Sequence, residues 1–202
     1  MSNNEDRSSI LTRNTRETQI TLELMLDGTG KFEGSVDCGF LRHMLELFTM
    51  HGRFDMNIKA FGDTHVDYHH LVEDTGIVLG KSFKNALSDM RGIKRYGSFI
   101  MPMDEALVLT ATDISGRQHL EYNAEVFSAR VGDFDTELIK EFWLGFTRGL
   151  NCTMHIKKLS GENTHHILEA VFKSAARTLS QAVQIDERFG NDIPSTKGTI
   201  DI

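Results

Sequence analysis

A short pattern of two histidines and a glutamate occurs twice in this chain and limits the possible folds more than any other feature. Residues 69–73 read His-His-Leu-Val-Glu, and 96 residues later residues 165–169 read His-His-Ile-Leu-Glu. In an α-helix, positions i and i+4 share a face and position i+1 is about 100° further round, so each copy gathers imidazoles and a carboxylate at one helix end. One copy could be a polar helix start with a capping glutamate. Two matched copies favour paired metal-binding clusters in an internally duplicated protein.

The side chains of the two clusters indicate which metal they could bind. Neutral imidazole with carboxylate favours Zn, Mn, Fe, Co or Ni over Ca or Mg. Neither cluster contains cysteine, which argues against a closed structural zinc site. Cys38 and Cys152 are the only cysteines and lie far from both clusters in sequence. A chain of this size needs no disulfide, so we expect two reduced thiols.

Composition and charge narrow the class of protein and of partner. The chain has 202 residues, of which 40% are hydrophobic, enough for the core of one large domain or two small ones. A formal net charge of -7, without any block of Lys or Arg, argues against binding to nucleic acid or to an anionic membrane. Residues 1–9 are polar, and nowhere do 18 apolar residues run together. We therefore expect a cytoplasmic protein that acts on a small molecule.

Hydrophobic periodicity outlines the same series of elements in both halves of the chain. In the first half it predicts a β-hairpin over 19–36, a helix over 40–52 closed by its last glycine, a strand over 54–60 and a helix from the first cluster to residue 86. The second half repeats this order. The predicted elements there are a hairpin over 106–122, a helix capped by Asp135 and ended by Gly149, a strand over 152–156 and a helix over 165–182.

The repeated order predicts an α+β fold built from two β-β-α-β-α half-domains. Each half would be a mixed sheet with its helices on one face, and the halves would pack together as one compact unit. We place the first half, with its N-terminal lead, at residues 1–90 and the second half, with the C-terminal tail, at 91–202. The junction falls near residues 88–104.

Symmetry between the halves extends the set of candidate ligands to eight. Matching strand residue Ile58 to Ile156 places Glu141 opposite His43 on equivalent helices. The metal candidates are therefore His43, His69, His70 and Glu73 in one half and Glu141, His165, His166 and Glu169 in the other. Eight ligands suit two metal ions better than one. Four histidines outside the set are expected to be ordinary surface or core residues, although one on a strand could support the ligands: His51, His65, His119 and His155.

Basic and hydroxyl side chains in glycine-rich surroundings suggest a phosphate site. The candidates are Arg91, Lys94, Arg95, Arg117, Ser195 and Lys197. Guanidinium groups form forked hydrogen bonds with phosphate, and the small residues of the tail 193–198 would let backbone approach an anion. Without a ligand, such charges are usually solvated, and such a chain end usually lacks fixed structure.

A series of motifs, in order along nearly the whole chain, matches one known family. The motifs are Arg16-Glu17-Thr18, Leu26-Asp27-Gly28-Thr29-Gly30, Phe40-Leu41-Arg42-His43-Met44-Leu45, Asp67-Tyr68-His69-His70-Leu71-Val72-Glu73-Asp74, Arg91-Gly92-Ile93, Arg95-Tyr96-Gly97, Asp113-Ile114-Ser115-Gly116-Arg117, Gly161-Glu162-Asn163-Thr164-His165-His166 and Ser195-Thr196-Lys197-Gly198. With these motifs the sequence resembles the imidazoleglycerol-phosphate dehydratases, hydro-lyases of histidine biosynthesis. No single motif would suffice, but their order does.

The resemblance implies a duplicated fold of the ribosomal protein S5 domain 2-like type, assembled into 24-subunit shells with manganese sites between subunits. The reaction it implies is conversion of imidazole glycerol phosphate to imidazole acetol phosphate and water. Carried over by position, the same eight residues would bind two Mn²⁺, and the phosphate would be held by Arg95, Arg117, Ser195 and Lys197. The catalytic set it implies is Glu17, His43, His69, Glu73, His165 and Glu169.

Glu17 matches a substrate-contacting glutamate of the family and is our candidate acid/base, with a plain surface carboxylate at a strand end as the alternative. An acid/base is needed because the hydrogen to be removed lies on a carbon that bears a hydroxyl and has no neighbouring carbonyl. The imidazole ring must therefore accept electrons, and metal ions on both ring nitrogens would help it to do so.

The sequence also departs from the family at four positions. The family commonly has Asp where Arg42 and Tyr68 stand, Thr for Leu71, and often His for Glu141. None of these changes removes a ligand type, but changes beside a ligand could alter metal affinity by roughly tenfold to a hundredfold. Two other functions fit the same ligands: a dinuclear metal-dependent phosphoester hydrolase, and a non-catalytic protein whose metals join subunits.

Overall fold

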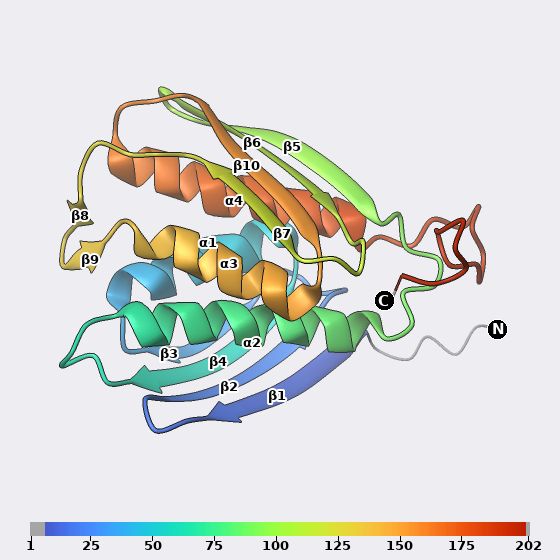
Figure 1. Cartoon of the computed structure of the whole chain (residues 1–202), viewed down its shortest axis with the longest axis horizontal. Helices are drawn as coiled ribbons and strands as arrows, with labels where there is room; N and C mark the ends of the chain where they lie inside the picture. The colour runs from blue at the N-terminus through green and yellow to red at the C-terminus, as the bar shows by residue number, and fades with distance from the viewer. Residues whose placement is uncertain (1–6, 201–202) are drawn as a thin grey trace.

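The computed structural model describes residues 7–200, in which four helices lie between two four-stranded sheets (Figure 1). Along the chain the elements are β1 (Ser8–Asn14), β2 (Thr18–Met25), β3 (Phe32–Val36), α1 (Gly39–Gly52), β4 (Asp55–Gly62), α2 (His69–Leu87), β5 (Tyr96–Met103), β6 (Ala106–Asp113), β7 (His119–Asn123), β8 (Arg130–Val131), β9 (Phe134–Asp135), α3 (Leu138–Leu150), β10 (Thr153–Ser160) and α4 (Thr164–Ala182). Of the helices in this range, none is long and apolar enough to cross a membrane.

The two sheets have the same topology, which confirms the duplicated α+β fold. Their strand orders are β1-β2-β4-β3 and β5-β6-β10-β7. In each, the last strand is parallel to its neighbour and the other pairs are antiparallel. Helices α2 and α4 cover their own sheets, and across the middle of the molecule α2 packs on α3 while α1 packs on α4. The division of the chain between residues 90 and 91 stays a prediction.

The predicted β-hairpins join the wrong strands. The segments 19–26 and 32–36 do not pair, because β4 lies between them and β3 runs parallel to it. The hairpin partner of β2 is β1, and in the second half the partner of β6 is β5. Both are edge strands whose residues alternate only between exposed and half-buried, so their hydrophobic signal is weak. Each half is therefore β-β-β-α-β-α, with the small β8–β9 hairpin added in the second.

Helix ends also differ from the prediction in detail. The left-handed residue that closes α1 is Arg53 rather than Gly52, and Asn151 takes this position after α3. Gly52 is needed for another reason, since a Cβ there would lie 2.2 Å from the Phe54 ring. Asp135 does not cap α3, because it belongs to β9.

Helices α2 and α3 pack backbone against backbone. A Cβ at Gly76 or at Gly80 of α2 would lie 2.2 Å from the carbonyl oxygen of Phe142 or Phe146 on α3. Two glycines of α3 face α2 in the same way: Gly145 and Gly149. Because no side chain fits at these four positions, α2 and α3 join the two halves of the fold with their backbones in close contact.

Helices α1 and α4 have the same relation in the fold but not the same packing. The positions equivalent to the four glycines are occupied by Leu47, His51, Phe172 and Ala176. With these larger residues, the contact between α1 and α4 is less extensive than that between α2 and α3. The α2–α3 pair is thus closed, meaning that its backbones are in contact with no side chain between them. The α1–α4 pair holds side chains between its helices.

The closed pair makes Gly76→Ala a test of the packing. We expect it to lower the free energy of unfolding by about 1–3 kcal/mol, because its Cβ meets rigid backbone on α3. Gly39→Ala is the matched control, since no atom lies within 4 Å of a Cβ at that helical position. The control should gain about 0.4–1 kcal/mol. Denaturant midpoints at equal protein concentration measure both, and equal midpoints would refute the packing argument.

Candidate active site

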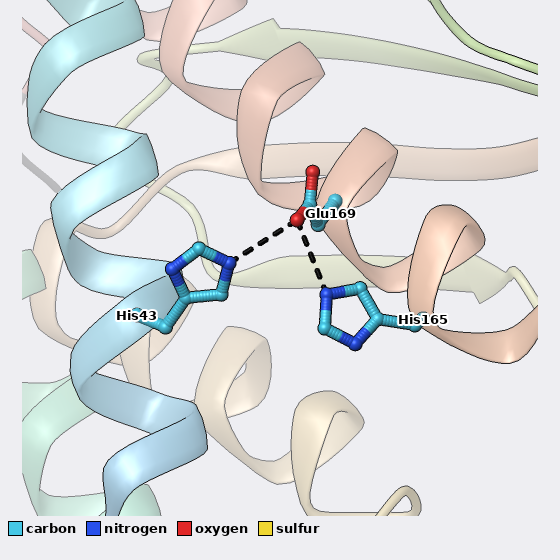
Figure 2. Close-up of side chains that lie close together, drawn as sticks. All are labelled: His43, His165 and Glu169. Carbon is cyan, nitrogen blue, oxygen red and sulfur yellow. Dashed lines mark hydrogen bonds and ion pairs between the residues drawn. The ribbon is translucent and has the colours of Figure 1, made fainter.

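Three of the predicted ligands meet between α1 and α4. The Nε2 atoms of His43 on α1 and His165 on α4 each lie 3.1 Å from Glu169 Oε1, and Figure 2 shows both rings pointing at this carboxylate. One ligand atom from each residue lies within 4.8 Å of the others. The imidazole side chains are 44% and 41% exposed, whereas that of Glu169 is 11% exposed. This half-open set of two nitrogens and one oxygen fits a divalent transition metal with positions left for a ligand.

Glu169 is held as a carboxylate by its neighbours. Its Oε2 accepts a hydrogen bond of 2.5 Å from Lys173, one helical turn further along α4. Burial alone would raise the pKa of Glu169, but hydrogen bonds from Lys173, His43 and His165 outweigh it and lower the pKa to about 2. The group therefore carries its negative charge throughout the neutral range, as a metal ligand must.

His70 and His166 form a second equivalent pair, each with its Nδ1 beside a carboxylate. His70 Nδ1 lies 3.0 Å from Asp63 Oδ2, and His166 Nδ1 lies 2.8 Å from Glu105 Oε2. These hydrogen bonds raise the pKa of both histidines, and the bond from His166 helps to lower the pKa of Glu105 to about 2. A neutral imidazole that donates from Nδ1 has its lone pair on Nε2, the usual arrangement of a metal-binding histidine.

The other predicted ligands lie apart from the three-residue group. The ring of His69 meets the ring of His70 edge-on, with centroids 6.0 Å apart. Glu73 Oε1 accepts a hydrogen bond of 2.9 Å from Arg148 on α3. Glu141 lines a separate pocket beside β7. The structure thus brings three of the eight candidates together, and metal binding by all eight stays a prediction.

The glycine packing of α2 on α3 explains this asymmetry. By symmetry, the contact of His43 with Glu169 corresponds to a contact of Glu141 with Glu73 across α3 and α2. There a Cβ at Gly145 would lie 2.6 Å from the Glu73 carbonyl oxygen, so the helices are too close for a second group of the same kind. Glu73 points instead to Arg148.

Three contact residues of the site were not predicted from the sequence: Asp63, Glu105 and Lys173. Lys173 could have been found, since it is four residues after Glu169 on a predicted helix. Glu105 could have been predicted only if β5 and β6 had been recognised as paired strands. Glu105 directly precedes β6 as Glu17 directly precedes β2, and the strands on either side match in register. The two glutamates are therefore equivalent, and each approaches an equivalent histidine.

The predicted phosphate ligands line one pocket at the C-terminal end of α4: Arg95, Arg117, Ser195 and Lys197. Arg95 pairs with Asp113 at 2.7 Å and donates to the Pro194 carbonyl at 2.8 Å, so it holds the tail against the second sheet. Three cationic groups around one hollow, with Asp113 as the neighbouring carboxylate among residues 7–200, suit a phosphate. Of the other two candidates, Arg91 pairs with Asp89 and Lys94 with Gln184, and neither lines the pocket.

The basic pocket and the histidine–glutamate group lie at opposite ends of α4, whose C-terminal end leads into the tail that lines the pocket. The N–H of Arg95 donates to the carbonyl of Ala182, the last residue of this helix, at 2.9 Å. His165 is the second residue of the same helix. At roughly 1.5 Å per residue, the helix between them spans about 26 Å.

The sequence of the chain matches one family over most of its length. The family model described as imidazoleglycerol-phosphate dehydratase matches residues 36–179. The imidazoleglycerol-phosphate dehydratase of Desulforamulus reducens is 50% identical over 195 residues, which cover 96% of this chain and 99% of the relative. That of Lachnoclostridium phytofermentans is 50% identical over 196 residues, 97% of this chain and 100% of the relative. This chain belongs to the imidazoleglycerol-phosphate dehydratase family.

Solved structures of the same family share the fold. The Staphylococcus aureus dehydratase has a TM-score of 0.80 and 37% identity, covering 89% of this chain and 99% of that one. The Pyrococcus furiosus protein, in complex with (S)-C348, has a TM-score of 0.81 and 39% identity, covering 94% and 99%. The family therefore confirms the resemblance seen in the motifs, and with it the assignment to a hydro-lyase that acts on a small phosphorylated substrate.

Tyr68, one of the departures from the family pattern, binds the loop between β8 and β9, close to the group of His43, His165 and Glu169. Its hydroxyl donates to Asp133 at 2.7 Å, and this bond together with burial raises the pKa of Tyr68 to about 12. Its ring stacks on Phe134, which contacts Phe40, and Phe40 meets His165 edge-on. The departure therefore reaches the candidate ligand through two intervening rings rather than by direct contact.

Proposed function

We propose that this dehydratase removes water from imidazole glycerol phosphate with two Mn²⁺ ions held by its histidines and glutamates. The observation that carries the proposal is a half-open group of two nitrogens and a buried, charged carboxylate in a chain of this family. When bound, such ions supply Lewis-acid stabilisation of negative charge on the substrate ring and a template for its orientation. His43, His165 and Glu169 would hold one ion, and Lys173 would keep Glu169 in place.

The basic pocket would hold the phosphate of the substrate. Arg95, which already binds Asp113 and the Pro194 carbonyl, and Arg117 supply positive charge, and Ser195 and Lys197 present donors from the tail. Binding at this remote end fixes the substrate without touching the reacting carbons, so it positions the ring rather than taking part in the chemistry.

The distance between the two sites supports a substrate site that is shared between copies of the chain. Only three carbons separate the ring from the phosphate ester in a glycerol phosphate, far less than the length of about 26 Å that α4 places between the metal group and the pocket. One substrate can contact both only where the pocket of one subunit faces the metal group of another. We therefore propose a homo-oligomer with sites between subunits, which the family resemblance extends to a 24-subunit shell in the cytoplasm.

Glu17 is the proposed acid/base because it is the less restrained of two equivalent glutamates. Glu105 is fixed by His166 at 2.8 Å and by the backbone N–H of Asn163 at 2.8 Å. Glu17 lies 3.9 Å from His70 Nε2, beyond hydrogen-bond range, and its side chain is 55% exposed. A carboxylate beside a candidate ligand but not locked to it can accept and return a proton.

The reaction itself is the first test. Purified full-length protein loaded with Mn²⁺ should convert imidazole glycerol phosphate to the ketone product, chelation should abolish turnover, and added Mn²⁺ should restore it. Glu169→Gln should act like the chelated protein, whereas Glu46→Gln, an exposed carboxylate on α1, should not. Release of inorganic phosphate instead would favour the phosphoester hydrolase, and full metal occupancy without product would favour the non-catalytic assembly protein.

The shared site makes a second prediction, for mixtures of inactive variants. His165→Ala removes a metal-group residue and Lys197→Ala removes a pocket residue, so each homo-oligomer should lose most of its activity. When the two variants are dissociated and reassembled together, some interfaces join an intact group to an intact pocket, and turnover should return. Reassembly of each variant alone is the control. A mixture no more active than its components would place both sites in one chain.

The third prediction concerns Glu17→Gln. We expect turnover to fall by about 10² to 10⁴, the usual effect of losing a general acid/base, with Mn²⁺ content and KM nearly unchanged. Glu33→Gln, at another exposed carboxylate of the first sheet, is the control. Steady-state kinetics and metal analysis measure both, and unchanged turnover in Glu17→Gln would remove it from the mechanism.

A further inference from the structure

Asp74 is a buried acidic residue with no assigned role. It follows Glu73 on α2 and is 6% exposed. Its Oδ1 lies 2.8 Å from a terminal nitrogen of Arg13, and its Oδ2 accepts a hydrogen bond of 2.6 Å from Thr18. Both partners belong to the β1–β2 hairpin. A buried carboxylate is costly unless it is paired, and here the pairing joins the helix to the hairpin.

The turn of this hairpin carries Glu17. Thr15 Oγ1 accepts from the backbone N–H of Glu17 at 3.1 Å and of Thr18 at 2.9 Å. The Glu17 carbonyl accepts from the N–H of Asp63 at 3.0 Å. The backbone of Glu17 is therefore tied to Thr18, and Thr18 is tied to Asp74.

Asp74 also has a fixed relation to His70. The two residues are four apart on α2 and so lie on the same face of the helix, one turn from each other. Asp63, which binds the Glu17 carbonyl, binds the His70 ring as well. The contacts of Asp74 with Arg13 and Thr18 thus determine where Glu17 stands relative to His70.

The second half of the molecule shows that the fold does not need these polar contacts. Arg13 pairs with Ile20 in the first sheet as Met101 pairs with Val108 in the second. By the same register Thr18 corresponds to Ala106, and by the repeated helix Asp74 corresponds to Ala170. Ala106 and Ala170 are buried and Met101 packs against the core. An apolar trio therefore occupies the equivalent positions in a half with the same order of strands and the same covering helix.

The two halves also differ in how they restrain the equivalent glutamates. Glu105 is held through its own carboxylate by His166. Glu17 approaches its histidine less closely, at 3.9 Å from His70 Nε2, while hydrogen bonds with Thr15 and Asp63 hold its backbone. An acid/base needs this combination of an accurate position and an unengaged carboxylate.

We propose that Asp74, with Arg13 and Thr18, is a positioning residue that holds the Glu17 turn in register with His70 for the dehydration. This inference rests on the proposed function, in which Glu17 moves the proton. Asp74 contacts neither the basic pocket nor the group of His43, His165 and Glu169, and its side-chain partners Arg13 and Thr18 lead to the Glu17 turn.

The test installs the apolar trio of the second half in the first: Arg13→Met, Thr18→Ala and Asp74→Ala together. The full-length, Mn-loaded variant should fold and bind metal normally and keep KM within about twofold, while kcat falls by about tenfold to a hundredfold because the acid/base is misplaced. In a Glu17→Gln background, the same three changes should lower kcat by no more than about twofold. Thr12→Val with Thr21→Val, which removes an exposed cross-strand contact of the same hairpin, is the control.

Hydrogen–deuterium exchange gives a readout independent of activity. Amides of residues 14–18 should exchange faster in the triple variant, but not in the control, because the turn has lost its attachment to α2. Asp74→Asn serves if the triple variant does not fold, since it keeps an acceptor for Thr18 and removes the charge that binds Arg13. It should give a smaller fall in kcat that also disappears in the Glu17→Gln background.

The outcomes separate this inference from the proposed function. Absence of product from the wild-type enzyme would refute the proposed function. If the wild type is active and Glu17→Gln is impaired, an unchanged kcat in the triple variant would overturn the inference alone. A fall in kcat that persists undiminished in the Glu17→Gln background, or that occurs without faster exchange of the turn, would also overturn it.

Discussion

The contact of α2 with α3 through four glycines is the constraint on which the rest of the structure depends. Each half of the duplicated chain has one sheet that its own helices cover, and the two halves meet through these helices. Backbone contact at Gly76 and Gly145 fixes the separation of the two halves. Across the same boundary between the halves, His43 on α1 meets Glu169 on α4, so the candidate metal group is built from both halves.

Duplication followed by unequal change explains the layout of the functional groups. Of two helix pairs with the same place in the fold, one is closed by glycine and the other accommodates imidazoles. Of two equivalent glutamates, one is bound to its histidine and the other is left unengaged. A third set of equivalent positions also differs. The first half has charged groups and a hydroxyl there (Arg13, Asp74 and Thr18), and the second half has apolar side chains (Met101, Ala170 and Ala106). In each case the shared backbone allows two chemistries, and only the side chains decide between them.

The sequence predicted those parts of the molecule whose pattern is strong and local. The four helices and the repeated histidines could be located because helical periodicity and the spacing of 69–73 and 165–169 need no partner strand. Edge strands β1 and β5 could not, since half of their residues face solvent. Because β1 and β5 were not predicted, the sequence did not show that Glu17 and Glu105 are equivalent. It also did not show that Asp74 contacts Arg13 and Thr18. Glu141 was matched to His43 by symmetry, but symmetry in sequence cannot show that glycine has closed the space between α3 and α2.

The length of α4 has a thermodynamic consequence. If substrate bridges two copies, binding and assembly are linked, and each must strengthen the other by the same factor. Substrate would slow the dissociation of the oligomer, and dilution of the enzyme would weaken its hold on substrate. An inhibitor that contacts the metal group of one subunit and the basic pocket of another would stabilise the oligomer, and its apparent affinity would change with enzyme concentration.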